Sequence, residues 1–354
     1  MKIDLIYFDA GGGHRAASKA LSSILSKTHP EWNVRCVNLT EVLEDKITGT
    51  GFEDLYNKII QSGWTFGFKY GLKVLQSVIK LNHKKLIKIL SAHWRETGPD
   101  MVVSLIPNFN RSLYESLKLT LPNVPYVTIL TDIADNPPNF WIEKQDQYFI
   151  CGSDKAVTQA HDIGHLGNVF LVSGMMLRPG FYDTSESKPE LGLDTNKPIG
   201  MVMFGGQGSK AMVTIAKKLP NTQLIFVCGH NKELEQQLIE IKNKNHVVLG
   251  FVSDMNRCMS ACSFFIGKPG PGSLSEAIQM KLPVITFRNK LTMPQELYNT
   301  EWVEKYNLGE IIKSPKYINV AVDNILTKKY NTLDNRAIFE IPAILENILK
   351  NHNL

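Results

Sequence analysis

Acidic residues are absent from one long stretch of this sequence. Between Leu55 and Arg95 there is no aspartate or glutamate, whereas seven lysines and one arginine occur there. The chain of 354 residues has a formal net charge of +5, so this segment alone makes the protein basic. A local excess of positive charge favours an anionic partner.

Long apolar runs and paired cysteines are also missing. No stretch approaches the roughly 20 apolar residues that a transmembrane helix needs. The pattern of residues 1–9 predicts a strand and lacks the basic and apolar regions of a signal peptide. We therefore expect no signal peptide. The five cysteines are odd in number, and only Cys258 and Cys262 are close together, which favours free thiols in a reducing cytoplasm.

Three common nucleotide or metal motifs are incomplete. The turn that ends in Gly13 and His14 lacks the third glycine of a dinucleotide-binding fingerprint, and no P-loop ending in Gly-Lys-Ser/Thr occurs. Asp132 and Asp135 have the wrong spacing for an Asp-x-Asp metal motif. We therefore expect no cofactor and no obligatory metal.

The sequence does contain three glycine-rich turns, each after a β-type run and before a helical one. They span residues 9–15, 204–209 and 267–273. Glycine lets the backbone approach a ligand, and helix N-termini attract phosphate. We interpret these turns as parts of two nucleotide-type α/β domains that together bind a phosphate-bearing donor. A transferase is therefore the first hypothesis.

Alternation of strand and helix patterns predicts a doubly wound α/β fold with parallel sheets. We expect a domain at 1–177, a polar linker at 178–197, a second domain at 198–335 and a closing segment at 336–354. The expected strands are 3–8, 34–39, 101–105, 125–130, 147–151, 169–172, 199–204, 223–228, 246–249, 263–266 and 283–287. The expected helices are 16–25, 53–95, 111–119, 209–219, 231–243, 255–260, 273–280 and 342–351, the last with Pro342 in its first turn.

His14 is the first candidate for acid–base chemistry. It follows three glycines at or near the first turn of a predicted helix. Because a helix N-terminus disfavours a cation, this imidazole could be neutral and accept a proton. The alternative is a surface histidine in a tight turn.

A stretch from Phe251 to Gly309 carries the most specific motifs. It contains Gly267-Lys-Pro-Gly-Pro-Gly-Ser-Leu-Ser-Glu-Ala277 and Pro294-Gln-Glu-Leu-Tyr-Asn299. These residues resemble the donor half of GT-B glycosyltransferases of family 28, most of all the monogalactosyldiacylglycerol synthases and diacylglycerol glucosyltransferases. More distantly they resemble the N-acetylglucosaminyltransferases that form lipid II.

The resemblance extends to the N-terminal half in the same order. Gly11–Ala17 is similar to the opening loop of the family, Thr131-Asp132 followed by Trp141 to a second loop, and Gly174–Phe181 to the crossing between domains. The family pattern has a His-Pro near that tryptophan, whereas this chain has Asp135-Asn-Pro-Pro-Asn-Phe-Trp141. This departure puts the identity of the acceptor in question.

The resemblance implies transfer of a hexose from a UDP-sugar with inversion. His14 would be the general base or orient the acceptor, and Asp132 is the second catalytic candidate, with a plain turn residue as the alternative. Glu276 would bind the ribose, Gln295 and Glu296 the donor sugar. The implied donor-binding set is Gly12, Gly13, Gly205, Gly206, Gln207, Phe251, Gly270, Gly272, Ser273, Glu276, Gln295, Glu296 and Asn299.

Simpler roles exist for some of these residues. Glu276 could complement the helix dipole in the N-terminal turn of its helix, and Asn299 could be a cap. Gln295 and Glu296 could belong to a solvated loop.

The basic segment has two interpretations. As an amphipathic helix preceded by aromatic residues it would bind an anionic membrane surface; alternatively it is a domain helix with a solvated lysine face. The predicted membrane contacts are Trp64, Phe66, Lys69, Lys73, Lys80, Lys84 and Lys88. No base-reading motif supports nucleic acid as a partner.

Together these features predict a glycosyltransferase that acts on a diacylglycerol-like lipid and is peripherally bound to the inner face of a membrane, with a composition that hints at a bacterial source. A soluble UDP-sugar epimerase, or a transferase acting on a small-molecule or glycan acceptor, is the first alternative. A non-catalytic nucleotide-sugar-binding or membrane-scaffolding protein is the second.

Overall fold

The computed structural model describes residues 1–8, 13–44, 76–183, 189–290 and 292–352. The chain forms two compact units. The first consists of Met1–Arg178, Met293–Gln295 and Arg336–Leu354, and the second of Pro179–Thr292 and Glu296–Asn335.

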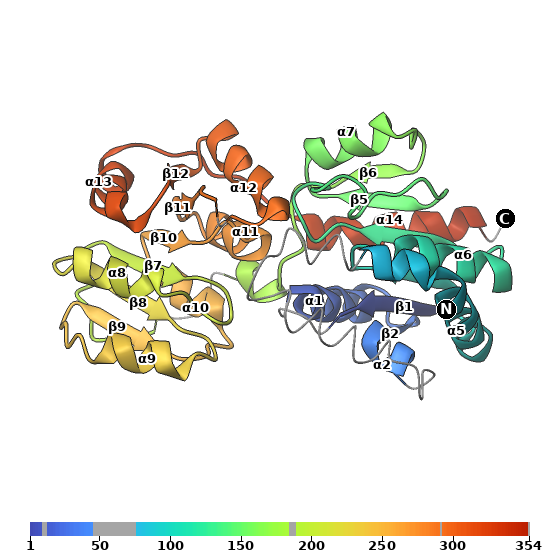
Figure 1. Ribbon diagram of the computed structural model, residues 1–354, viewed down its shortest axis with the longest axis horizontal. Coiled ribbons are helices and arrows are strands. Elements are labelled where there is room, and N and C mark those ends of the chain that lie inside the picture. Colours follow the sequence, from blue (N-terminus) through green and yellow to red (C-terminus); the bar gives the residue numbers. More distant parts are fainter. Residues whose placement is uncertain (9–12, 45–75, 184–188, 291, 353–354) are drawn as a thin grey trace. The chain divides into compact units, whose positions relative to one another are not determined.

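The first unit contains a six-stranded parallel sheet in the order β2-β1-β3-β4-β5-β6. The C-terminal helix α14, red in Figure 1, lies with the N-terminal elements of this unit and packs against α1. The strands are β1 (Lys2–Tyr7), β2 (Asn33–Asn38), β3 (Met101–Ser104), β4 (Tyr126–Ile129), β5 (Tyr148–Cys151) and β6 (Val169–Leu171). The helices are α1 (Gly13–Thr28), α2 (Leu39–Glu44), α5 (His83–Thr97), α6 (Asn110–Thr120), α7 (Asp154–Asp162) and α14 (Ala337–His352).

The second unit repeats this architecture with the order β12-β11-β10-β7-β8-β9. Its strands are β7 (Ile199–Met203), β8 (Gln223–Val227), β9 (His246–Leu249), β10 (Phe264–Gly267), β11 (Val284–Phe287) and β12 (Gly309–Ile312). Its helices are α8 (Ala211–Lys218), α9 (Lys232–Ile239), α10 (Met255–Ser260), α11 (Pro271–Gln279), α12 (Pro294–Lys305) and α13 (Ile318–Thr327), with short 3₁₀ turns η1 (Pro179–Tyr182) and η2 (Pro315–Tyr317).

Both sheets have a point where the order of strands reverses. In the first unit it lies between β1 and β3, and in the second between β7 and β10. In open parallel sheets the carboxyl ends of the two strands at such a point flank the ligand-binding crevice. Each unit therefore has one crevice with a defined pair of strand ends.

The predicted doubly wound α/β class is confirmed, and all eleven expected strands form within one residue of their predicted bounds, whereas β12 was not expected. Four-residue strands such as β3 and β10 are buried along their whole length. This is expected for the central strands of a parallel sheet, because helices cover both of its faces. Two predictions about helices were wrong. Helix α14 begins at Ala337, so Pro342 lies inside it rather than in its first turn, and residues 294–305 form helix α12 rather than a loop.

Candidate functional site

His14 lies at the crevice of the first unit. It is the second residue of α1, which follows β1, and its Nδ1 lies 2.8 Å from the carbonyl oxygen of Leu105, just beyond β3. A carbonyl only accepts, so Nδ1 carries the proton and donates it. The remaining ring nitrogen, Nε2, is therefore the one whose lone pair can receive a proton.

Burial keeps this imidazole neutral. It lowers the pKa of His14 to about 4, although the hydrogen bond to Leu105 works in the opposite direction. Thr131, which follows β4, places its hydroxyl oxygen 3.2 Å from the same Nδ1. Hydrogen bonding on one ring nitrogen and neutrality at pH 7 leave Nε2 positioned to accept a proton, and a pKa of about 4 makes it a weaker base than an imidazole that titrates near pH 7.

Trp141 joins the two residues predicted to be catalytic. Its indole Nε1 donates to Oδ2 of the buried Asp132 at 2.8 Å, and its ring centroid lies 6.0 Å from that of His14. The structure thus brings both His14 and Asp132 next to one indole. Their catalytic roles remain predictions.

The loop that departs from the family pattern has its own internal support. The carboxylate of Asp135 accepts hydrogen bonds from the backbone N–H of Trp141 at 2.6 Å and of Asn139 at 2.9 Å. Burial raises the pKa of Asp135 above its ordinary value, and these amides partly oppose that rise. Gln159 of α7 bonds both the N–H and the carbonyl of Asp135, at 2.9 and 2.7 Å.

Glycines surround the crevice of the second unit. Gly205 follows β7 with φ +74°, a backbone conformation that side chains disfavour, and Gly270 caps α11 after β10. A Cβ at Gly206 or Gly272 would meet no described atom within 4 Å. Packing of the described residues therefore does not require glycine at these two positions, and they leave space for a ligand beside the N-terminus of α11.

Lys268 is the residue that sequence reasoning missed here. Its ammonium forms a 2.7 Å ion pair with the buried Glu296. Its Cε would lie 3.3 Å from a Cβ on Gly205 and 3.5 Å from one on Gly270, so its side chain runs between the two glycine turns. The sequence signal that could have identified Lys268 is a basic residue directly after a predicted strand, inside a glycine-rich turn.

The structure revises the surroundings of several predicted donor residues. Gln295, Glu296 and Asn299 lie on helix α12, where Asn299 donates to the carbonyl of Pro269 at 2.7 Å. Glu276 lies in the second turn of α11 rather than the first, because this helix already begins at Pro271. Ser273, three residues before it, lies on the same side of that helix.

Two further predicted positions lie beyond the ends of β9 and β7, which flank β8 in the sheet. Phe251, beyond β9, is 65% exposed and stacks on His230 at a centroid distance of 4.6 Å. Gln207 is exposed, and its carbonyl accepts a hydrogen bond from Asn231. An exposed aromatic pair of this kind could contact a flat base, so it leaves the assignment of Phe251 open.

The described part of the basic segment matches the domain-helix alternative. Its apolar residues, among them Ile79, Leu86 and Leu90, pack into the core of the first unit. Lys80, Lys84 and Lys88 are exposed, so their contact with a membrane stays a prediction. Gly12, Trp64, Phe66, Lys69 and Lys73 lie outside the described residues. Among the described helices, none has the length and apolar character needed to cross a membrane.

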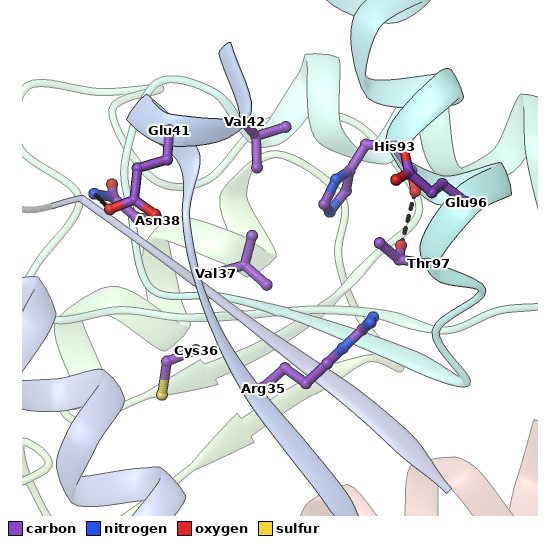
Figure 2. Close-up of a pocket in the computed structure, with 9 residues that line it drawn as sticks. All are labelled: Arg35, Cys36, Val37, Asn38, Glu41, Val42, His93, Glu96 and Thr97. Atoms are coloured by element: carbon purple, nitrogen blue, oxygen red, sulfur yellow. Dashed lines mark hydrogen bonds between the residues drawn. The ribbon is translucent and has the colours of Figure 1, made fainter. Parts of the chain in front are cut away.

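A pocket of about 400 Å³ lies elsewhere, at the outer strand β2 of the first sheet (Figure 2). It contains none of the predicted site residues, and Arg35 on its wall is already paired with the buried Asp4. Its lining residues are Arg35, Cys36, Val37, Asn38, Glu41, Val42, His93, Glu96 and Thr97. Within the described ranges, no cluster of three or more histidine, cysteine or acidic side chains could hold a metal ion.

Comparison with protein families gives one match. Residues 201–336 match the glycosyltransferase family 28 C-terminal domain. This range includes both glycine turns of the second unit and the Lys268–Glu296 ion pair.

Two curated plant proteins are similar over nearly the whole chain. Monogalactosyldiacylglycerol synthase 1, chloroplastic, of Arabidopsis thaliana is 28% identical over 348 residues, which cover 91% of this chain and 64% of that protein. The chloroplastic enzyme of Spinacia oleracea is 28% identical over 359 residues, 94% of this chain and 67% of that protein. The chain thus spans about two thirds of the length of these relatives.

Solved structures establish the likeness of the fold. MurG of Acinetobacter baumannii aligns with a TM-score of 0.63 and 10% identity, over 98% of this chain and 99% of that one. The UDP-bound MnaA of S. aureus aligns with a TM-score of 0.65 and 13% identity, over 99% of this chain and 97% of that one.

Proposed function

Since residues 201–336 form a glycosyltransferase family 28 C-terminal domain within a GT-B fold, we propose that this protein transfers a hexose from a UDP-sugar to a lipid hydroxyl. The observation that carries the proposal is His14: a neutral imidazole at a strand-order reversal, with its Nδ1 committed to Leu105. The similarity to monogalactosyldiacylglycerol synthases supports a diacylglycerol-like acceptor.

The proton of the acceptor hydroxyl passes to Nε2 of His14 as its oxygen attacks the anomeric carbon. The C–O bond to UDP breaks on the opposite face of the sugar, so the configuration inverts. Asp132, held by the indole of Trp141, orients the acceptor or the protonated histidine. A neutral base is favourable because it needs no deprotonation before the reaction.

The second unit stabilises the departing diphosphate. Backbone N–H groups at the N-terminus of α11 and the ammonium of Lys268 supply positive charge beside the open positions Gly206 and Gly272. We therefore propose that no divalent metal is obligatory. Activity should survive exhaustive chelation with EDTA; loss on chelation and recovery with Mn²⁺ would contradict this.

The exposed lysines Lys80, Lys84 and Lys88 support action at an anionic membrane surface. Because Leu86 and Leu90 are buried in the core and Leu81 is the exposed large apolar side chain of this described stretch, we propose that the contact is mainly electrostatic. Binding to anionic vesicles should therefore weaken as the ionic strength rises.

The deciding experiment measures UDP release from a panel of UDP-sugars, with and without vesicles that contain diacylglycerol. The proposal expects release that requires one sugar nucleotide and the lipid together. Release or sugar interconversion without lipid would refute the lipid acceptor.

A second function has a specific observation in its favour. Within residues 76–97 most apolar side chains, among them Ile79, Leu86 and Leu90, pack into the core of the first unit, and Leu81 is exposed. This finding favours a soluble UDP-sugar epimerase or a transferase with a small-molecule or glycan acceptor. Detection of an epimerised UDP-sugar in the absence of acceptor would establish the epimerase.

A further inference from the structure

Asp135 is a buried carboxylate with an unusual set of partners. Of the other buried acidic side chains, Asp4 and Glu296 have the cationic partners Arg35 and Lys268, and Asp132 accepts a hydrogen bond from the indole of Trp141. Asp135 is 4% exposed, and among the described residues it has backbone amides as partners and no cation. A buried charge without a counter-ion is costly, so a purely structural turn gains little from it.

The hydrogen bonds of Asp135 lead directly to the candidate catalytic residues. Oδ1 accepts from the backbone N–H of Trp141 at 2.6 Å, and Oδ2 from that of Asn139 at 2.9 Å. The carbonyl of Trp141 accepts from the side chain of Asn110 at 3.2 Å, so the backbone of Trp141 is held from both sides. From this fixed backbone the indole reaches Asp132.

Helix α7 in turn fixes Asp135. The amide of Gln159 makes two hydrogen bonds to the backbone of Asp135, accepting from its N–H and donating to its carbonyl. Helix α7 thus fixes Asp135, and Asp135 in turn fixes the backbone of Trp141. The indole of Trp141 then binds Asp132 and lies next to His14.

We propose that Asp135 is a positioning residue, which fixes the indole of Trp141 so that Asp132 and His14 keep their relative geometry. It touches no reacting atom itself. Its effect on catalysis rests on the proposed function, whereas its effect on the indole can be measured without any substrate.

The first test observes the indole N–H of Trp141 by NMR in the full-length protein, with Trp141→Phe assigning the signal. Asp135→Asn retains the size of the side chain but turns one of its two acceptor atoms into a donor. We expect the signal to shift and its exchange with solvent to become about tenfold faster. Asp162→Asn, which removes an exposed carboxylate from the end of α7, is the matched control.

An unchanged indole signal in folded Asp135→Asn overturns the proposal, whatever the activity of the protein. If Asp135→Asn does not fold, Gln159→Ala loosens the same residue from α7 and carries the test. The same shift and faster exchange are then expected, and their absence overturns the proposal.

The second test uses UDP-release kinetics in a double-mutant cycle. Asp135→Asn should lower kcat about 10- to 100-fold, the size expected for misplaced catalytic groups, and leave the KM for the UDP-sugar unchanged. In a Trp141→Phe background the same change should cost little, because its effect runs through the indole. Additive losses overturn the proposal. Absence of activity in the wild-type protein instead refutes the proposed function and leaves the NMR result to decide this inference.

Discussion

The two units have the same sheet order around their reversal points, yet different chemistry lies there. In the first unit, the ends of β1 and β3 hold a neutral histidine through one hydrogen bond to a carbonyl. In the second, the ends of β7 and β10 hold an ion pair between Lys268 and Glu296 beside a helix N-terminus.

This difference shows how one topology serves two opposite electrostatic tasks. Removing a proton from a hydroxyl calls for an unprotonated acceptor, and burial keeps His14 unprotonated at neutral pH by lowering its pKa to about 4. Receiving a diphosphate calls for positive charge and open backbone N–H groups, which Lys268 and α11 offer. Under the proposed function, acid–base chemistry belongs to the first unit and stabilisation of the leaving group to the second.

The largest expected effect comes from His14→Ala. Loss of a general base should lower kcat on the order of 100- to 10,000-fold while the Kd for UDP stays the same, because UDP binding is assigned to the second unit. Steady-state UDP release and calorimetric titration measure the two quantities. His161→Ala, an exposed histidine of α7, is the control. Near-normal turnover of His14→Ala would show that the first unit does not supply the general base, and the proposed division of roles between the units would then be wrong.

Lys268→Met tests the other side of the comparison. Hydrogen bonds to charged groups contribute about 1.5–3 kcal/mol, so UDP affinity should fall about 10- to 100-fold while uridine binding changes little. Calorimetric titration with both ligands measures the contrast, and Lys268→Arg should retain most of the affinity. Equal losses for UDP and uridine would show that the ammonium does not act on the diphosphate.

Lys350→Met provides a matched control for that variant. It breaks an ion pair of the same 2.7 Å length, but Glu346 is 39% exposed whereas Glu296 is 5% exposed. Only Lys268→Met leaves a buried carboxylate unpaired, so it alone should lower the free energy of unfolding by more than about 1 kcal/mol.

A smaller effect is expected from Gly272→Ala. The added Cβ meets no described atom within 4 Å, so stability should stay the same or rise by about 0.5–1 kcal/mol, as for alanine in a helix. UDP affinity should fall several-fold if the backbone approaches phosphate there. Gly267→Ala places its Cβ 2.5 Å from the carbonyl oxygen of Met203 and should instead destabilise the fold. Unchanged UDP binding by Gly272→Ala would contradict a ligand at this helix start.

The comparison also explains which parts could be predicted from the sequence. Buried strands such as β3 and β8 are continuous apolar runs, and their pattern is visible without the fold. Helix α12 was not predicted because it buries Glu296, Asn299 and Thr300, so its inward face is polar and lacks apolar periodicity. Tertiary contacts, rather than its own pattern, determine that helix.

In the candidate site, too, local features could be predicted from the sequence and tertiary contacts could not. His14 could be identified from its glycine turn, because that signal is local. Its hydrogen bond to Leu105 spans 91 positions, and the ion pair of Lys268 spans 28. Such partners depend on the order of strands in the sheet, which a single sequence pattern does not contain.

The smallest predicted effect concerns a second group in the first unit whose pKa is shifted toward the neutral form by burial. Burial raises the pKa of Glu143 to about 7, against an opposing hydrogen bond from the backbone N–H of Arg111 at 2.8 Å. The folded state then binds an extra proton between about pH 4.5 and 7, so this carboxyl makes the protein less stable as the pH rises through that range. His14 acts in the opposite direction, since its depressed pKa makes folding more favourable as the pH rises from about 4 to 6.5.

Glu143→Gln separates these contributions because an amide can still accept from Arg111 but does not titrate. The variant should equal the wild type near pH 4.5 and exceed its free energy of unfolding by on the order of 1 kcal/mol above pH 7. Urea denaturation across this range measures the difference. Parallel pH curves for the two proteins would mean that Glu143 is ionised at its ordinary pKa, and its carboxylate would then be a charged partner of Arg111 at neutral pH.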